Sequence, residues 1–149
     1  VTCSINNIVH NYRSDDAAVA TVLFENGAMA TVDTFFCIPD ESSKNVLEIY
    51  GSKGSVLAKG TIGQGAAGEA TAFLKTAETG YNARQGRGTG GGVPIEPKPK
   101  NTYCGEIEEF GWAIIEGRTP LNSAELGLRS QEILAACYES ARTGWTVDV

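Results

Sequence analysis

The clearest pattern in the chain is a pair of apolar runs on either side of Asn26-Gly27. Residues 18–36 read AVATVLFENGAMATVDTFF, and β-branched and apolar residues dominate both sides of the Asn-Gly pair. Asn-Gly favours a two-residue type I′ turn because both central residues of that turn need a positive φ. The pattern therefore predicts a β-hairpin, and a two-residue turn would pair Phe24 with Met29.

Both faces of this hairpin would be largely apolar, with Asp33 as the only charge. A sheet with one face in water alternates apolar and polar residues along each strand. Because neither face shows that alternation, we expect both to be covered, one of them by helices, and we expect self-association through the second. The two faces would consist of Val19, Thr21, Leu23, Ala30, Val32 and Thr34, and of Ala18, Val22, Phe24, Met29, Thr31 and Phe35.

Other stretches have the composition of strands or extended edge segments. Residues 44–58 predict a second hairpin that turns at Gly51 to Gly54. Residues 93–100 contain three prolines, so they can form a sheet edge but not a central strand. Single strands are expected at residues 1–9, 70–76 and 145–149.

Two amphipathic helices are predicted in the C-terminal part. The first spans residues 102–116, with Asn101 or Thr102 as its cap and Gly117 at its end. Its apolar stripe, at helical spacing, is Tyr103, Ile107, Phe110 and Ile114. The second spans residues 124–142, with Ser123 as cap and Gly144 at its end. Its apolar face would include Leu126, Ile133, Leu134, Cys137 and Ala141.

This order of elements predicts an α+β fold with a large, mostly antiparallel, open sheet and helices on one face. A length of 149 residues fits one domain, residues 1–149. Ten of the eighteen glycines lie in residues 60–92, which we predict to be a glycine-rich loop excursion within that domain.

Charge and composition exclude several classes of function. The net charge of −6 disfavours a nucleic-acid partner, because the phosphate backbone attracts basic surfaces. No run approaches the roughly 20 apolar residues of a membrane span. Residues 1–12 show no signal peptide, so we expect a cytoplasmic protein without a membrane partner. The start at Val1, without a methionine and directly in a strand-like run, suggests a fragment or a processed chain.

The four cysteines do not form a zinc-knuckle motif or a redox-active pair, because no two of them are spaced as C-x-x-C. They are Cys3, Cys37, Cys104 and Cys137. In a cytoplasmic protein we expect reduced thiols rather than two disulfides.

Three motifs are candidates for chemistry, and each has a simpler interpretation. Gly63 to Gly68 matches G-x-G-x-x-G, but the residues that follow resemble a strand or coil rather than the helix of a dinucleotide site, so we interpret it as a loop. His10, the only histidine, could be a general base, but no recognisable arrangement of Asp, Ser or Cys accompanies it. Residues 81–100 carry a local charge of +3 that can meet an anion or remain solvated. We therefore predict no catalytic, cofactor-binding or metal residue in this chain.

Four stretches together carry a resemblance to a known family. They are Asp16-x-Ala18 through Leu23-Phe24-x-Asn26-Gly27; Leu47-Glu48-Ile49-Tyr50-Gly51-x-Lys53-Gly54-Ser55; Tyr103-x-x-Glu106-Ile107-x-x-Phe110; and Gly127-Leu128-Arg129-Ser130 through Tyr138-x-Ser140-Ala141-Arg142-x-Gly144. In this order and spacing they resemble the C-terminal domain of the Gfo/Idh/MocA family of NAD(P)-dependent oxidoreductases, which includes glucose–fructose oxidoreductase and inositol dehydrogenases.

The resemblance implies a parent enzyme that transfers hydride between NAD or NADP and a small-molecule substrate, a sugar, polyol or related hydroxy compound. Its cofactor would bind an N-terminal Rossmann domain that also carries a catalytic lysine in a Glu-Lys-Pro motif. An Asp and a His four residues apart would follow, and neither motif is present here. His10 does not match, because position 6 is Asn6.

The resemblance also implies that one face of the open sheet is an oligomer interface, in a dimer or tetramer. By analogy, Phe36, Asn101 and Tyr103 would line the substrate pocket, although the ring of Tyr103 can instead anchor the core. This chain would then be a substrate-binding and dimerisation domain, inactive by itself. The alternatives are a free-standing non-catalytic oligomerisation or sugar-binding module, and a pseudoenzyme subunit.

Overall fold

The computed structural model describes residues 1–43, 45–74 and 91–149. The chain divides into two compact units, the first formed by Val1–Ser43 with Thr119–Val149 and the second by Lys44–Arg118. Each unit is built around its own antiparallel sheet. The predicted α+β class with open sheets is confirmed, and the strands form two sheets rather than a single large one.

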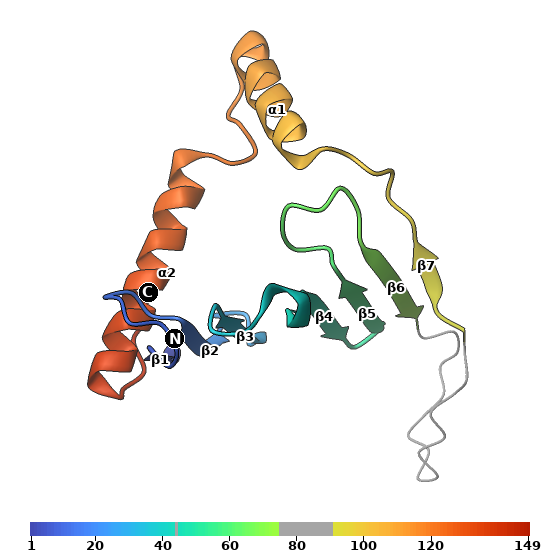
Figure 1. Cartoon of the computed structure of the whole chain (residues 1–149). Coiled ribbons are helices and arrows are strands. Elements are labelled where there is room, and N and C mark those ends of the chain that lie inside the picture. The colour runs from blue at the N-terminus through green and yellow to red at the C-terminus, as the bar shows by residue number, and fades with distance from the viewer. Residues whose placement is uncertain (44, 75–90) are drawn as a thin grey trace. The chain divides into compact units, whose positions relative to one another are not determined.

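The first unit contains a three-stranded sheet and the longer helix. Strands β1 (Thr2–Asn6), β2 (Ala17–Leu23) and β3 (Met29–Phe35) are antiparallel neighbours in that order. Helix α2 (Ala124–Thr143) lies against β1, as Figure 1 shows. A short 3₁₀ helix (Asp40–Ser42) follows β3. The buried core joins the sheet to the helix through Cys3, Ala20 and Cys137, with Val1, Ile5 and Ile133 packed around them.

The helix face against β1 contains a buried serine. Ser140 is 1% exposed, and its Oγ accepts a hydrogen bond of 2.9 Å from the backbone N–H of Cys3. Because a buried backbone donor needs a partner, this bond allows α2 to approach the strand closely. The buried residues of α2 are Ala136, Cys137 and Ser140.

The first hairpin forms where it was predicted, but its register differs by one residue. Leu23 pairs with Met29, whereas a two-residue turn would have paired Phe24 with Met29. The turn explains the difference, because the Gly27 N–H donates to the Phe24 carbonyl at 2.9 Å and Gly27 adopts a φ of 83°. A type I turn followed by one left-handed glycine makes a three-residue loop, so only Gly27 needs the positive φ.

The observed register determines which side chains share a face of the first sheet. Residues paired across neighbouring strands share a face, so Ala20 lies with Val32 on the face of the buried core, and Thr21 lies with Thr31 on the other. A slip of one residue between strands changes which side chains share a face. The two predicted sets of face residues therefore differ from the observed ones, and Asp33 is the only charged residue of β2 and β3. The open face of the first sheet is mixed, and its β2 and β3 residues are Ala17, Val19, Thr21, Leu23, Met29, Thr31, Asp33 and Phe35.

The second unit contains a four-stranded sheet. Strands β4 (Val46–Gly51), β5 (Gly54–Lys59), β6 (Glu69–Leu74) and β7 (Val93–Ile95) are antiparallel neighbours in that order (Figure 1). The predicted second hairpin is confirmed. The proline-bearing β7 lies at the sheet edge, as its missing backbone donor requires.

Helix α1 (Thr102–Glu116), also in the second unit, begins and ends where its caps predict. The Asn101 side-chain oxygen accepts from the Cys104 N–H at 3.0 Å, which identifies Asn101 rather than Thr102 as the cap. Gly117 ends the helix in the left-handed conformation, with φ of 65°.

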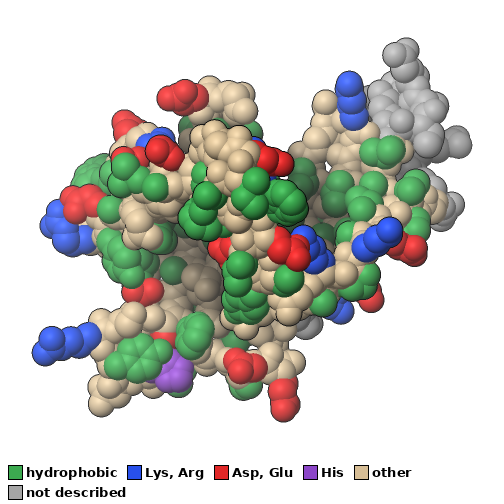
Figure 2. Space-filling view, turned by 90° about the horizontal axis from the view of Figure 1, so that it is seen from above, with side chains coloured by type: hydrophobic (Ala, Val, Ile, Leu, Met, Phe, Trp, Pro, Cys, Tyr) green, Lys and Arg blue, Asp and Glu red, His purple; other side chains and the backbone are tan. Residues whose placement is uncertain are grey.

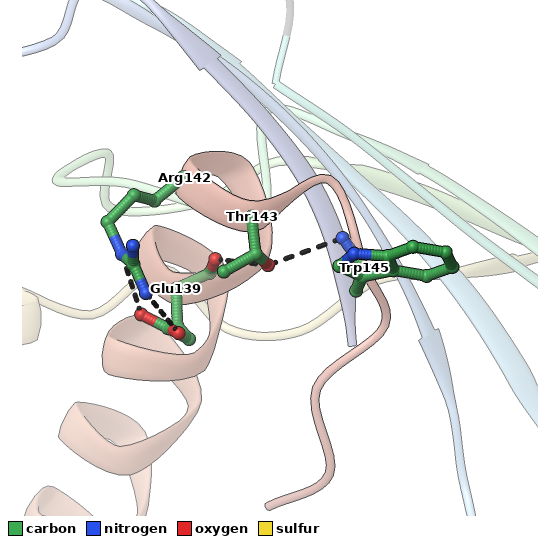
Figure 3. Close-up of polar contacts among 4 residues, drawn as sticks. All are labelled: Glu139, Arg142, Thr143 and Trp145. Carbon is green, nitrogen blue, oxygen red and sulfur yellow. Dashed lines mark hydrogen bonds and ion pairs between the residues drawn. The ribbon is translucent and has the colours of Figure 1, made fainter.

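Helix α2 ends in a small network of polar contacts, drawn in Figure 3. Arg142 donates to both carboxylate oxygens of Glu139, at 2.6 and 3.0 Å. The Thr143 hydroxyl donates to the Glu139 carbonyl at 2.8 Å and accepts from the backbone N–H of Trp145 at 3.3 Å. With Gly144 at φ of 76°, these contacts end the helix near its predicted last residue.

Two strand predictions at the ends of the chain need correction. The predicted strand at residues 145–149 is absent; Val147 shares backbone hydrogen bonds with Val1 at 2.7 and 2.9 Å, but no ladder extends from them. The predicted strand at residues 1–9 ends at Asn6, because the next backbone N–H groups turn toward Asp16. That turn builds the loop described next.

Candidate functional site

The loop between β1 and β2, residues 7–16, is organised around a buried carboxylate. Asp16 is 2% exposed, and its oxygens accept hydrogen bonds from the backbone N–H groups of Ile8, Val9 and His10 at 2.7, 2.8 and 2.9 Å. Three converging N–H groups form a cradle for negative charge. We call this arrangement the Asp16 cradle.

Opposing effects set the pKa of Asp16. Burial raises the pKa because the carboxylate loses hydration, whereas the three backbone N–H groups and the nearby His10 lower it. The lowering effects prevail, and the pKa lies below the usual range of an aspartate. Asp16 is therefore ionised at neutral pH, which is the form that accepts all three bonds.

Further hydrogen bonds hold the rest of the loop. The Asn7 side-chain nitrogen donates to the carbonyls of Tyr12 and Ser14, at 2.7 and 2.8 Å. Asp15 accepts a bond of 2.7 Å from the Tyr138 hydroxyl, which ties the loop to α2. Because the phenol donates to a carboxylate, the pKa of Tyr138 is raised. The two consecutive aspartates thus have different structural roles.

The cradle places His10 next to Phe36. The His10 Nε2 lies 3.1 Å from the Phe36 carbonyl oxygen, and the imidazole stacks on the Tyr12 ring with 5.1 Å between centroids. The Phe36 side chain is 79% exposed. Figure 2 shows the single histidine, in purple, at the surface beside hydrophobic side chains. This aromatic surface can contact the carbon skeleton of a small polar molecule.

Asn101 and Tyr103 lie together at the start of α1. The Asn101 oxygen is engaged as the helix cap, so its structural role is established. Tyr103 is 54% exposed, which leaves it accessible. Phe36 belongs to the first unit and these two residues to the second, and a pocket shared by all three stays a prediction.

A hollow of about 480 Å³ on the polar side of α1 was missed by the sequence analysis. Trp112, 57% exposed, forms part of it, and Glu108 lies 3.4 Å from both the Lys100 Nζ and the Cys104 Sγ. The bond to Glu108 raises the pKa of Cys104. An exposed indole ring among charged donors and acceptors can bind a polyol. The available signal was a tryptophan outside the apolar stripe of the helix. The lining residues are Lys100, Gly105, Glu108, Glu109, Trp112, Glu116 and Arg118.

The glycine motif Gly63 to Gly68 lies between two antiparallel strands, β5 and β6. Strand β6 starts at Glu69, directly after the last glycine, so the motif opens into a strand and not into the helix of a dinucleotide fingerprint. A dinucleotide phosphate needs that helix. The interpretation as a loop is therefore confirmed, and these residues do not fit a nicotinamide cofactor.

Only part of the predicted basic stretch, residues 81–100, can be described. Arg84 and Arg87 lie outside the described residues, as do residues 75–90 of the glycine-rich excursion. Lys100 pairs with Glu108.

The side chains and helices of the described residues bear on metal binding and membrane crossing. Within residues 1–43, 45–74 and 91–149, no group of three or more His, Cys, Asp or Glu side chains could hold a metal ion. No helix in that part of the chain is long and apolar enough to cross a membrane. Each of the four cysteines carries a free thiol.

The chain matches known proteins at the level of family and fold. The family model of the Gfo/Idh/MocA oxidoreductase family, C-terminal alpha/beta domain, matches residues 5–149. The crystal structure of an aldose-aldose oxidoreductase from Caulobacter crescentus, complexed with glycerol, has a similar fold, with a TM-score of 0.75 and 21% sequence identity. That match covers 99% of this chain and 40% of the other. No curated protein sequence matches the chain.

Proposed function

The chain belongs to the Gfo/Idh/MocA oxidoreductase family as its C-terminal alpha/beta domain, and we propose that it forms substrate-binding walls of an enzyme that oxidises or reduces a sugar or polyol hydroxyl. The family match over residues 5–149 carries this proposal. The similar fold of an oxidoreductase named for aldoses, with glycerol bound, supports an aldose or polyol as the substrate class.

The residues of this chain would bind and orient the substrate. Phe36 in the first unit and Tyr103 in the second each expose a ring that can contact the C–H groups of a sugar. In the hollow on the polar side of α1, Glu108 can bind hydroxyl groups. Such contacts hold a substrate in the reacting geometry and exclude water from it. Under this proposal the catalytic groups lie in the N-terminal part of the parent enzyme.

The cofactor would also bind outside this chain, because Gly63 to Gly68 does not fit a dinucleotide. NAD or NADP, when bound in the parent enzyme, would supply the hydride chemistry. The chain alone would then have no turnover. It spans 40% of the length of the aldose-aldose oxidoreductase, which leaves room there for a separate cofactor domain.

A binding experiment with the 149-residue chain tests this division of roles. We expect no turnover and no affinity for NAD or NADP by calorimetry, but saturable NMR shifts at Phe36 or Tyr103 on addition of D-glucose or glycerol. Phe36→Ala and Tyr103→Ala should weaken these shifts. Phe24→Ala is the matched control, since Phe24 is half-exposed at the opposite end of the hairpin. Measurable NAD(P) binding, or no response to any aldose or polyol, would overturn the proposal.

We further propose that the open face of the first sheet binds a second copy of the chain. This face exposes Leu23 and Met29 side by side, at 72% and 82%. Adjacent exposed apolar side chains of this size favour association.

A further inference from the structure

Phe36 combines a fixed backbone with an exposed side chain. Its N–H donates to the Asp16 carbonyl at 2.7 Å, and its carbonyl oxygen lies 3.1 Å from the His10 Nε2. The residue as a whole, however, is 79% exposed. The two hydrogen bonds therefore fix the main chain at Phe36, and with it the Cα–Cβ bond from which the ring extends.

His10 is in turn fixed from two sides. Its backbone N–H donates to the Asp16 Oδ2 at 2.9 Å, and its imidazole stacks on Tyr12 with an angle of 14° between the ring planes. Because Asp16 is buried and also holds the two preceding N–H groups, His10 cannot shift without breaking the Asp16 cradle. The cradle thus determines where the imidazole meets Phe36.

The bond between His10 and Phe36 joins two segments that are 26 residues apart. It links the loop after β1 to the turn that follows β3. A carbonyl oxygen only accepts, so Nε2 must carry the hydrogen in this bond. Both the neutral Nε2–H form and the charged imidazole can donate, and the contact therefore persists in either protonation state.

We infer that His10 is a positioning residue, whose imidazole fixes the peptide group of Phe36 and thereby directs the Phe36 ring toward a bound aldose or polyol. This inference rests on the proposed function and adds the residue that sets the geometry of the substrate wall. His10 acts through Phe36 and takes no part in the reaction. The only histidine, to which no role was assigned from sequence, thus gains a defined one.

Glucose titrations of the isotope-labelled 149-residue chain test this inference. His10→Ala should raise the apparent dissociation constant for D-glucose about as much as Phe36→Ala does, by up to about tenfold, the equivalent of roughly 1.4 kcal/mol. His10→Gln should restore much of the affinity, because its amide N–H₂ can donate to the same carbonyl. Tyr12→Leu is the matched control, since it removes the stacking but keeps the hydrogen bond.

A second measurement, without ligand, separates this inference from the proposed function. The carbonyl ¹³C signal of Phe36 should move in His10→Ala and return in His10→Gln. An unchanged signal, or normal glucose affinity of His10→Ala beside weakened affinity of Phe36→Ala, would overturn the positioning role but leave the substrate wall. If the wild-type chain gives no saturable response to glucose, the substrate wall itself fails, whatever the carbonyl signal shows.

Discussion

At the scale of single residues, two polar side chains are buried in the described part of the chain, and both satisfy backbone groups. Asp16 accepts three N–H groups of its own loop, and Ser140 accepts the N–H of Cys3 from the neighbouring strand. Neither role follows from local sequence. The partner of Ser140 lies 137 residues away in sequence. The hydrophobic pattern of α2 placed Leu134 on the apolar face, but Leu134 is exposed in the structure. A cap at Asn101 or Thr102 was predictable because its partner lies within one turn, and the structure identifies Asn101.

Replacing Ser140 tests how much its buried hydrogen bond contributes to the free energy of unfolding. Ser140→Ala leaves the Cys3 N–H without an acceptor, and an unsatisfied buried donor costs about 1–3 kcal/mol of unfolding free energy. Urea denaturation should show this loss. The matched control is Ser130→Ala on the same helix, whose exposed hydroxyl donates to the Leu126 carbonyl and whose loss should change stability by less than about 0.5 kcal/mol. Equal effects of the two variants would contradict the assignment.

The low pKa of Asp16 predicts a sign for the pH dependence of stability. A carboxyl group whose pKa is lower in the folded state stabilises the fold above its unfolded pKa, about 3.9 for aspartate. That contribution is lost as the pH falls through the lower, folded value. Asp16→Asn should therefore lower the melting temperature at neutral pH, and the two melting curves should converge in acid.

Calorimetry from neutral pH into the acid range measures this convergence. The control is Asp33→Asn, an exposed carboxylate on β3, which should leave the melting temperature close to that of the wild type throughout. A gap between wild type and Asp16→Asn that stays constant into acid would show that the charge of Asp16 does not stabilise the cradle.

At the scale of elements, the helices were predictable and the register of the first hairpin was not. Caps and left-handed glycines lie next to the helix ends they define, so a cap at Asn101 or Thr102 and the stop at Gly117 located α1 from sequence. Asn26-Gly27 is compatible with a two-residue loop or a three-residue loop. The choice depends on whether one residue or both adopt positive φ, which flanking apolar residues do not specify.

Two glycine substitutions should have opposite effects. Gly27→Ala forces a side chain into a backbone with φ of 83°, which should cost about 1–2 kcal/mol. Gly127 lies inside α2, where an added Cβ meets no atom within 4 Å, so Gly127→Ala should stabilise by up to about 1 kcal/mol. Thermal denaturation of the two variants measures both signs. A stabilised Gly27→Ala would be incompatible with the left-handed turn.

At the scale of the whole molecule, each unit presents apolar side chains to its surroundings. On α1 the predicted stripe is exposed, with Ile107 at 73% and Ile114 at 67%. In the second sheet, cross-strand pairing places an almost entirely apolar set on one face, formed by Leu47, Ile49, Val56, Ala58, Ala70, Ala72, Leu74, Val93 and Ile95. Periodicity predicts that such faces are covered, but it does not identify what covers them, because the covering surface is remote in sequence.

Self-association through the open face of the first sheet is the expectation at this scale. Leu23 and Met29 form a cross-strand pair on that face, so Met29→Lys would place a charge in the interface without entering the core. Sedimentation velocity should show a dimer or tetramer for the wild type and a monomer for Met29→Lys, and circular dichroism should show that the variant is still folded. The matched variant is Val22→Lys, on the half-buried opposite face, which should destabilise the fold itself. A wild-type monomer at high concentration, or an intact oligomer of Met29→Lys, would exclude this face as the interface.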